Sequence, residues 1–264
     1  MSTTSYESNG DIAVVTLSNP PLNLFVASMA EGIDEAVRRA TAEGRRAMVI
    51  KADGPVFCSG ADVSQFQGLT SETGAELISR ATKLLGALED APFPVIAAVH
   101  GMCLAAGIEV ALACDLVIAA EDTKFAQVEA MIGATTLLGG VYRLAERCGP
   151  ARAKEIVYTG DFYTAHQFQQ WNIVNRVVPG PQLHEQALGW AQQLAAGPTR
   201  AHQATKRLVR EFLEHGSRQT DRYLADIAPV LFETGDMRTA VDYLLRHGAR
   251  KLAQSCDEIR FEGR

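Results

Sequence analysis

Short apolar runs of strand length alternate with longer amphipathic stretches through the first part of the chain. Four runs are rich in β-branched or small apolar residues: 11–18, 47–52, 95–99 and 116–120. Two intervening stretches, 26–42 and 72–88, have apolar side chains at helical spacing with charges between them. This alternation predicts an α/β fold with short, right-handed crossover connections.

The pattern changes in the second half of the chain. From Pro150 onward it is nearly all helical, apart from a brief strand predicted at 176–178. Gly197 and Pro198 together predict a boundary. We therefore expect an α/β core over 1–197 that carries the active site, followed by a helical region over 198–264 that is rich in Arg and Lys.

One apolar stretch, 94–120, has the length of a membrane span. It contains Glu109 and Asp115, however, and an aspartate at a bilayer centre costs roughly 2.5–3.5 kcal/mol. We interpret the stretch as a strand, a turn at Gly101, a short helix from 106 or 107, and a second strand in a protein core. Asp115 is expected to tie a turn, and His100 to be a core histidine.

Composition excludes several classes of protein. With 264 residues, 47% of them apolar and 21% charged, the chain can bury a large core. A net charge of −6 argues against nucleic-acid binding, which needs a basic face, although it leaves small anions open. The sequence lacks a P-loop, a GxGxxG fingerprint, an HExxH motif and a Ser-His-Asp order.

The five cysteines are scattered, with no CxxC pair and no metal-like spacing with histidine. They indicate reduced, mostly core-filling thiols in a cytoplasmic protein, with no metal site. The first ten residues lack the basic patch and apolar segment of a signal peptide.

Two glutamates stand in apolar surroundings. Glu109 lies among apolar residues at 108–112, and Glu129 lies in the run 125–133. Burial disfavours an ionised carboxylate, so its pKa rises towards values useful for proton transfer. Alternatively, Glu109 caps a helix start or pairs with a buried arginine, and Glu129 is simply a charge at a helix N-terminus.

Two loops of small residues accompany these glutamates. The first spans 56–62, after a strand, and the second spans 101–107 and runs directly into Glu109. Small residues and a helix start leave backbone N–H groups available to an approaching oxygen. One donor from each loop would form an oxyanion hole for a thioester carbonyl that becomes an enolate. The structural alternatives are a tight turn at the first loop and close backbone packing at the second.

Together these motifs resemble the enoyl-CoA hydratase/isomerase (crotonase) superfamily across nearly the whole chain. The matching segments, in order, are 19–23, 57–62, 94–101, 107–115, 125–133, 158–161 and the region of Phe232, Asp236 and 243–245. The resemblance implies a spiral of ββα units with a helical C-terminal trimerisation region. It also implies a homotrimer or a dimer of trimers.

The resemblance also assigns roles to residues. The oxyanion donors are the backbone N–H groups of Ser59 and Ala106; Glu109 activates water and Glu129 delivers the α-proton. Ala61, Asp62 and Val63 match the segment that binds coenzyme A, and Lys251, with Arg246 and Arg250 as further candidates, is expected to meet its phosphates. Coenzyme A is part of the substrate, and no other cofactor is implied. With both glutamates present, the resemblance favours a hydro-lyase that hydrates 2-enoyl-CoA thioesters.

The chain departs from the family pattern in two places. Ala105-Ala106-Gly107 stands where a glycine run is common, and 134–140 differs from the usual Pro-Gly-Ala-Gly-Gly-like stretch. Leu137, Leu138 and Gly139 are therefore expected to shape a different acyl pocket beside Glu129. A double-bond isomerase, another enolate enzyme and a non-catalytic acyl-CoA-binding or assembly protein remain alternatives.

Overall fold

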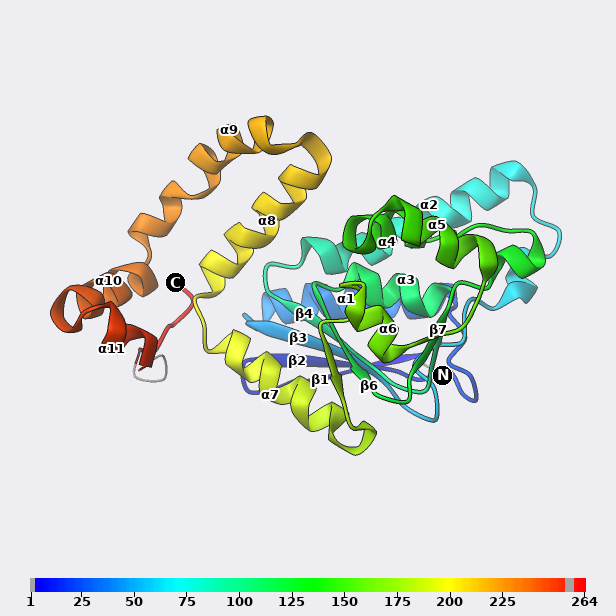
Figure 1. Cartoon of the computed structure of the whole chain (residues 1–264), viewed down its shortest axis with the longest axis horizontal. Coiled ribbons are helices and arrows are strands. Elements are labelled where there is room, and N and C mark those ends of the chain that lie inside the picture. The colour runs from blue at the N-terminus through cyan, green and yellow to red at the C-terminus, as the bar shows by residue number, and fades with distance from the viewer. Residues whose placement is uncertain (1–2, 255–258) are drawn as a thin grey trace.

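The computed structural model describes residues 3–254 and 259–264, and its centre is a six-stranded sheet (Figure 1). The strand order is β1-β2-β3-β4-β6-β9, in which β1 is antiparallel to β2 and the other neighbours are parallel. The strands are β1 (Thr4–Asn9), β2 (Ile12–Leu17), β3 (Ala47–Ala52), β4 (Val95–Val99), β6 (Leu116–Ala120) and β9 (Arg176–Val178).

Helices cover both faces of this sheet, which explains why its central strands are largely apolar. On one face lie α1 (Ala27–Ala42), α2 (Ser71–Asp90) and α3 (Ala106–Ala113), and on the other lies α7 (Leu183–Ala195) (Figure 1). Successive strand residues point to opposite faces, so Ile50 packs in the larger core, whereas Val49 packs with α7.

A second, three-stranded sheet lies beside the first. Its order is β5-β7-β8, formed by β5 (Met102–Leu104), β7 (Lys124–Ala126) and β8 (Tyr163–Thr164). Three further helices belong to this part of the chain: α4 (Gly140–Cys148), α5 (Pro150–Thr159) and α6 (Ala165–Gln170). The small sheet and α4 are important below, because they position the loops and the turn around Glu109.

Most predicted elements are confirmed. The strands expected at 47–52, 95–99, 116–120 and 176–178 match β3, β4, β6 and β9, and the helix expected at 72–88 is α2. The apolar stretch 94–120 is divided into β4, β5, α3 and β6, in agreement with the core interpretation. Among the described residues, we find no helix with both the length and the apolar character needed to cross a bilayer.

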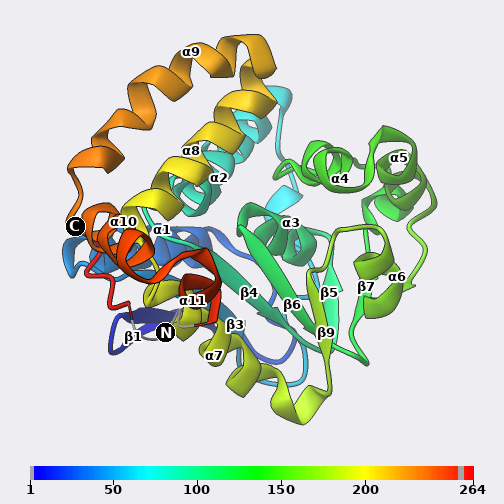
Figure 2. The ribbon, with the colours of Figure 1, turned by 60° about the vertical axis from the view of Figure 1, so that its left-hand side comes forward.

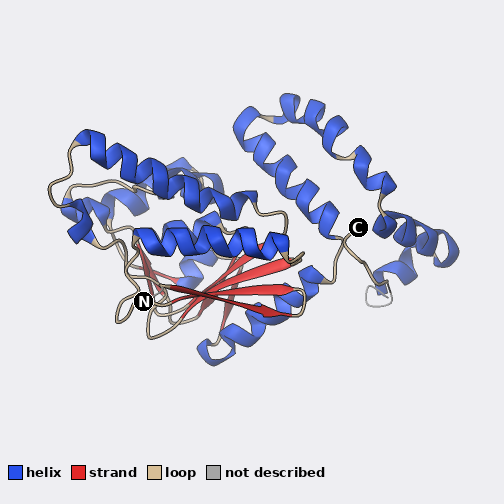
Figure 3. Ribbon diagram, turned by 180° about the vertical axis from the view of Figure 1, so that it is seen from behind, coloured by secondary structure: helices blue, strands red, loops and turns tan. Residues whose placement is uncertain are grey.

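After Gly197 and Pro198 the described part of the chain forms four α-helices that extend away from the core (Figures 2 and 3). They are α8 (Thr199–His215), α9 (Ser217–Ile227), α10 (Gly235–His247) and α11 (Ala249–Gln254). Lys206 of α8 is attached to the core, because its Nζ contacts Asp115 and the carbonyl of Leu88, each at 2.8 Å. Phe212, Leu224 and Leu245 of this region are exposed.

Candidate active site

The two loops predicted from the sequence lie against each other. Cys58 and Cys103 form a parallel β-bridge, and the N–H of Leu104 donates to the carbonyl of Cys58 at 2.9 Å. A Cβ at Gly107 would lie 2.5 Å from the Cys58 carbonyl oxygen, which explains the glycine. The close packing considered for the second loop is therefore present, and it also brings the two candidate donor segments together.

The backbone donors at this contact differ in their availability. Ala106 is the first residue of α3, and none of the hydrogen bonds among the described residues uses its N–H. Ala105, immediately before it, has φ 47° and ψ −115°, a rare conformation for a residue with a side chain. The N–H of Ser59, by contrast, donates to the Leu22 carbonyl at 3.1 Å.

A cavity of about 190 Å³ lies beside these loops and is lined by Ser59, Ala106, Glu109 and Glu129. Its walls are largely apolar, and much of the lining comes from α1 and α2. Of the other residues predicted for the site, five line the cavity: Ala61, Asp62, Val63, Leu137 and Leu138. Gly139, at the N-cap of α4, and Lys251, exposed on α11, do not line it.

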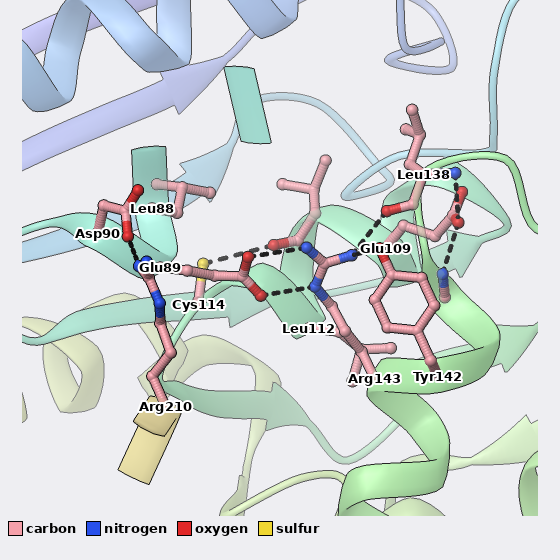
Figure 4. A network of polar contacts seen from close by, with 12 residues as sticks. Leu88, Glu89, Asp90, Glu109, Leu112, Cys114, Leu138, Tyr142, Arg143 and Arg210 are labelled. Carbon is pink, nitrogen blue, oxygen red and sulfur yellow. Dashed lines mark hydrogen bonds and ion pairs between the residues drawn. The ribbon is translucent and has the colours of Figure 1, made fainter. Parts of the chain in front are cut away.

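Glu109 lies in the first turn of α3 and is only 2% exposed. Its Oε1 accepts hydrogen bonds from the N–H groups of Leu138 and Gly140, each at 2.8 Å (Figure 4). The pKa of Glu109 is raised to about 7, mainly by burial and also by the nearby Glu129, against the lowering effect of the two N–H donors. At neutral pH this carboxylate can therefore both take up and release a proton.

Glu129 begins a short 3-10 helix, Glu129–Ile132, and is 8% exposed. Burial raises its pKa above the usual range. With its amide nitrogen facing the carboxylate, Gln127 donates to Oε1 at 3.1 Å and to Oε2 at 3.2 Å. Gln127 is fully buried and was not found by sequence reasoning, although a glutamine two residues before Glu129 in an apolar run was an available signal.

Arg143 is a second residue that sequence reasoning missed. It comes from α4 and is 6% exposed. It forms a bidentate ion pair with Glu89, in which Nε lies 2.7 Å from Oε1 and Nη2 lies 2.8 Å from Oε2. Its Nη1 also donates to the Leu138 carbonyl at 2.8 Å, so it holds the turn whose N–H groups bind Glu109 (Figure 4). A Cβ at Gly139 would lie 2.2 Å from this nitrogen, so glycine leaves room for the arginine.

Asp115 and His100, which were expected to be structural, do not line this cavity. Asp115 accepts the N–H of Val95 at 2.8 Å and pairs with Lys206, as expected for a residue that ties a turn. The Nε2 of His100, which is partly buried, is 2.9 Å from the Gly54 carbonyl oxygen.

The buried carboxyl of Glu109 should make the free energy of unfolding depend on pH. Because the pKa of Glu109 is raised to about 7, the fold favours its protonated form, and its contribution to stability declines as pH rises from about 4.5 through 7. We expect Glu109→Gln to increase the free energy of unfolding at pH 8 by about 2–3 kcal/mol, with the gain shrinking towards pH 4.5.

Urea unfolding of both proteins at several pH values would measure this difference. Glu76→Gln, at an exposed position of α2, is the control and should change little. A Glu109→Gln variant that is no more stable than the wild type at pH 8 would contradict the expectation.

A mostly parallel sheet, a pair of packed loops, a helix start and two buried carboxylates at one cavity define an α/β protein with a site suited to acid–base chemistry. Residues 7–235 match the sequence model of the family described as enoyl-CoA hydratase/isomerase, and the chain belongs to this family. The resemblance inferred from the sequence is thereby confirmed.

Comparisons with individual relatives support the same family assignment. A "Probable enoyl-CoA hydratase" of Rhizobium meliloti is 32% identical over 237 residues, which cover 88% of this chain and 90% of the relative. The crystal structure of an enoyl-CoA hydratase from Polaromonas sp. JS666 is 28% identical, with a TM-score of 0.86 and coverage of 92% and 96%. A Geobacillus kaustophilus HTA426 structure named "Enoyl-CoA Hydrates Subunit I" is 27% identical, with a TM-score of 0.91 and coverage of 99% and 98%. The expected crotonase fold, with its C-terminal helices, is confirmed.

Proposed function

We propose that this protein is an enoyl-CoA hydratase that adds water across the 2,3-double bond of a 2-enoyl-CoA thioester. The observation that supports it most is the meeting of two buried carboxylates, Glu109 and Glu129, at one cavity beside Ser59 and Ala106. A proton shuttle between two carbons needs one carboxylate, whereas addition of water uses one group to accept a proton and another to supply one.

In this mechanism the thioester carbonyl oxygen lies at the start of α3, where the free N–H of Ala106 and the helix dipole stabilise negative charge. Glu109, as the carboxylate, takes a proton from water while the water oxygen bonds to C3. The electrons of the double bond move to the carbonyl oxygen and form an enolate. Glu129 acts in its protonated form, which burial favours because it raises the pKa of this carboxyl, and gives its proton to C2 as the thioester is restored.

The proposal also covers the coenzyme A part of the substrate and the assembly of the protein. Ala61, Asp62 and Val63 line the same cavity and are proposed to bind coenzyme A. Lys251 on α11 remains our candidate for the phosphates. The exposed apolar side chains of α8 to α10 are consistent with a homotrimer or a dimer of trimers, which would bury them.

A second candidate is a double-bond isomerase of the same family. It is favoured by Leu137 and Leu138, which line the cavity and make the surroundings of the glutamates more apolar. An apolar pocket that excludes water would favour moving a proton within the substrate over adding water.

Incubation with 2-enoyl-CoA and with 3-enoyl-CoA substrates in ¹⁸O water separates the two reactions. Under the proposal, mass spectrometry shows one ¹⁸O in the product of the 2-enoyl substrate. Conversion of the 3-enoyl substrate without ¹⁸O would establish the isomerase instead. Tight binding of acyl-CoA without turnover over a broad range of chain lengths would indicate the non-catalytic alternative.

A further inference from the structure

One lysine of α8, Lys206, is largely buried and joins this helix to the core. Its Nζ lies 2.8 Å from the Leu88 carbonyl oxygen and 2.8 Å from Oδ2 of Asp115. The Phe93 carbonyl oxygen is a third acceptor, at 3.5 Å. The three N–H donors of the ammonium group thus meet three acceptors. They connect α8 to the last turn of α2, to the segment before β4 and to the residue before β6.

The Leu88 carbonyl depends on a partner from outside its own helix. It belongs to the last turn of α2, and the residue four positions on is Pro92, which has no N–H to donate. The last turn of α2 also contains no basic residue. Lys206 supplies both the hydrogen bond and the positive charge that stabilise a helix C-terminus. It therefore fixes the last turn of α2.

Glu89 lies in this same turn and links it to the candidate active site. Its carboxylate binds Arg143, whose Nη1 donates to the Leu138 carbonyl (Figure 4). The N–H of Leu138 donates in turn to Oε1 of Glu109. A displacement of the last turn of α2 would therefore be passed on to the carboxylate of Glu109.

Helix α8 holds the residues on both sides of Glu89. Lys206 binds the Leu88 carbonyl, and Arg210 forms an ion pair with Asp90 (Figure 4). Both partners of the Arg210 pair are at least half exposed, and such surface pairs contribute little. The position of Glu89 consequently depends mainly on Lys206.

We propose that Lys206 positions the carboxylate of Glu109, by fixing the turn of α2 from which Glu89 holds Arg143. Lys206 does not line the cavity, so it is a positioning residue. The inference rests on the proposed function in one respect, that Glu109 is the base of the reaction. The helical region, which the family resemblance assigns to assembly, then also sets the geometry of the proposed base.

The test compares Lys206→Met with Arg207→Met. The first keeps the apolar stem of the lysine and removes the ammonium, and the second removes an exposed cation at the next position of α8. With a 2-enoyl-CoA as substrate, Lys206→Met should lower kcat about tenfold and leave KM nearly unchanged, because a displaced base slows the reaction without altering substrate contacts. Arg207→Met should have wild-type kinetics.

A double-mutant cycle shows whether Lys206 acts through Arg143. If it does, adding Lys206→Met to Arg143→Met causes no further loss of kcat. Losses that multiply would mean that the two residues act independently, and this would overturn the proposal. Wild-type kcat in Lys206→Met would overturn it as well.

A second variant guards against unfolding, because Lys206→Met leaves Asp115 without its charged partner. The double variant Asp115→Asn, Lys206→Met removes both charges, and the asparagine oxygen can still accept the N–H of Val95. It should have the same tenfold loss of kcat while its circular dichroism spectrum matches that of the wild type. Wild-type kinetics in this folded double variant would contradict the proposal.

The titration of Glu109 gives a readout that does not depend on turnover. Infrared spectroscopy follows the C=O stretch of its protonated carboxyl across pH, and the band is identified by its absence from Glu109→Gln. The charged groups that affect the pKa of Glu109 are Glu129, which raises it, and Arg143, which lowers it. When Arg143 and the Leu138 N–H are displaced, the pKa should rise, so the band should persist to higher pH in Lys206→Met and be unchanged in Arg207→Met.

The infrared and kinetic outcomes separate the two proposals. If the titration of Glu109 depends on Lys206 but no enoyl-CoA is hydrated, the hydratase proposal fails and this inference stands. If hydration occurs and the band titrates at the same pH in Lys206→Met and the wild type, the hydratase proposal stands and this inference is wrong.

Discussion

Replacement of Glu109 with glutamine is expected to lower kcat for hydration of a 2-enoyl-CoA by about 10²–10⁴-fold. Glutamine keeps the shape of the side chain, and its oxygen can still accept the N–H groups of Leu138 and Gly140, but it cannot take a proton from water. Glu129→Gln should cause a loss in the same range, because the proton for C2 is then missing. Loss of absorbance of the conjugated thioester measures both.

The pH profile provides a sharper readout than the rate alone. Because the pKa of Glu109 is raised to about 7, the wild-type rate should rise as pH increases through that value and deprotonates the base. Glu109→Gln should abolish this rise. Full activity in both glutamine variants would refute the two-carboxylate mechanism, and loss in Glu129→Gln alone would indicate a one-carboxylate reaction.

Arg143→Met is expected to lower kcat/KM by about 10²-fold although Arg143 does not line the cavity. Arg143 donates to the Leu138 carbonyl, and the Leu138 N–H donates to Glu109, so loss of the arginine frees the 138–140 turn and lets the carboxylate move (Figure 4). Displacement of a catalytic group by about 1 Å can have an effect of this size. Because the charge of Arg143 lowers the pKa of Glu109, the rise of the rate with pH should also move to higher pH.

Arg152→Met is the matched control. It removes an arginine from the neighbouring helix α5, where its partner Glu155 is half exposed, and it should leave the rate and pH profile unchanged. Glu89→Gln weakens the ion pair but keeps Arg143, so an intermediate loss is expected. Wild-type kinetics and an unshifted profile in Arg143→Met would mean that the 138–140 turn holds its shape alone.

The sequence predicted those elements whose pattern of apolar and polar residues directly reflects which of their side chains are buried. Strand β4 and helix α2 were found because a buried parallel strand is apolar throughout and a covering helix is apolar on one side. β1 was missed because it is a largely exposed edge strand with polar residues, and β5 because three residues are too few for a pattern.

The candidate site likewise combines features that the local sequence predicts with contacts that only the fold creates. The burial of Glu109 and Glu129 could be predicted because a charged residue in an apolar run is a local signal. The role of Arg143 could not, because its partner Glu89 is 54 residues away in the sequence and belongs to another helix. The bond from the Ser59 N–H to Leu22 is likewise a contact between distant loops, and only the three-dimensional structure reveals it.

The unusual backbone of Ala105 has a consequence for the order of events at this site. A non-glycine residue in such a conformation is disfavoured by about 1–3 kcal/mol and is maintained by its surroundings, here including the bond from its N–H to Ala126. The adjoining amide of Ala106 is therefore oriented before any ligand arrives. An acyl-CoA bound at this point would find the Ala106 N–H already oriented, so none of its binding free energy would be needed to turn this amide.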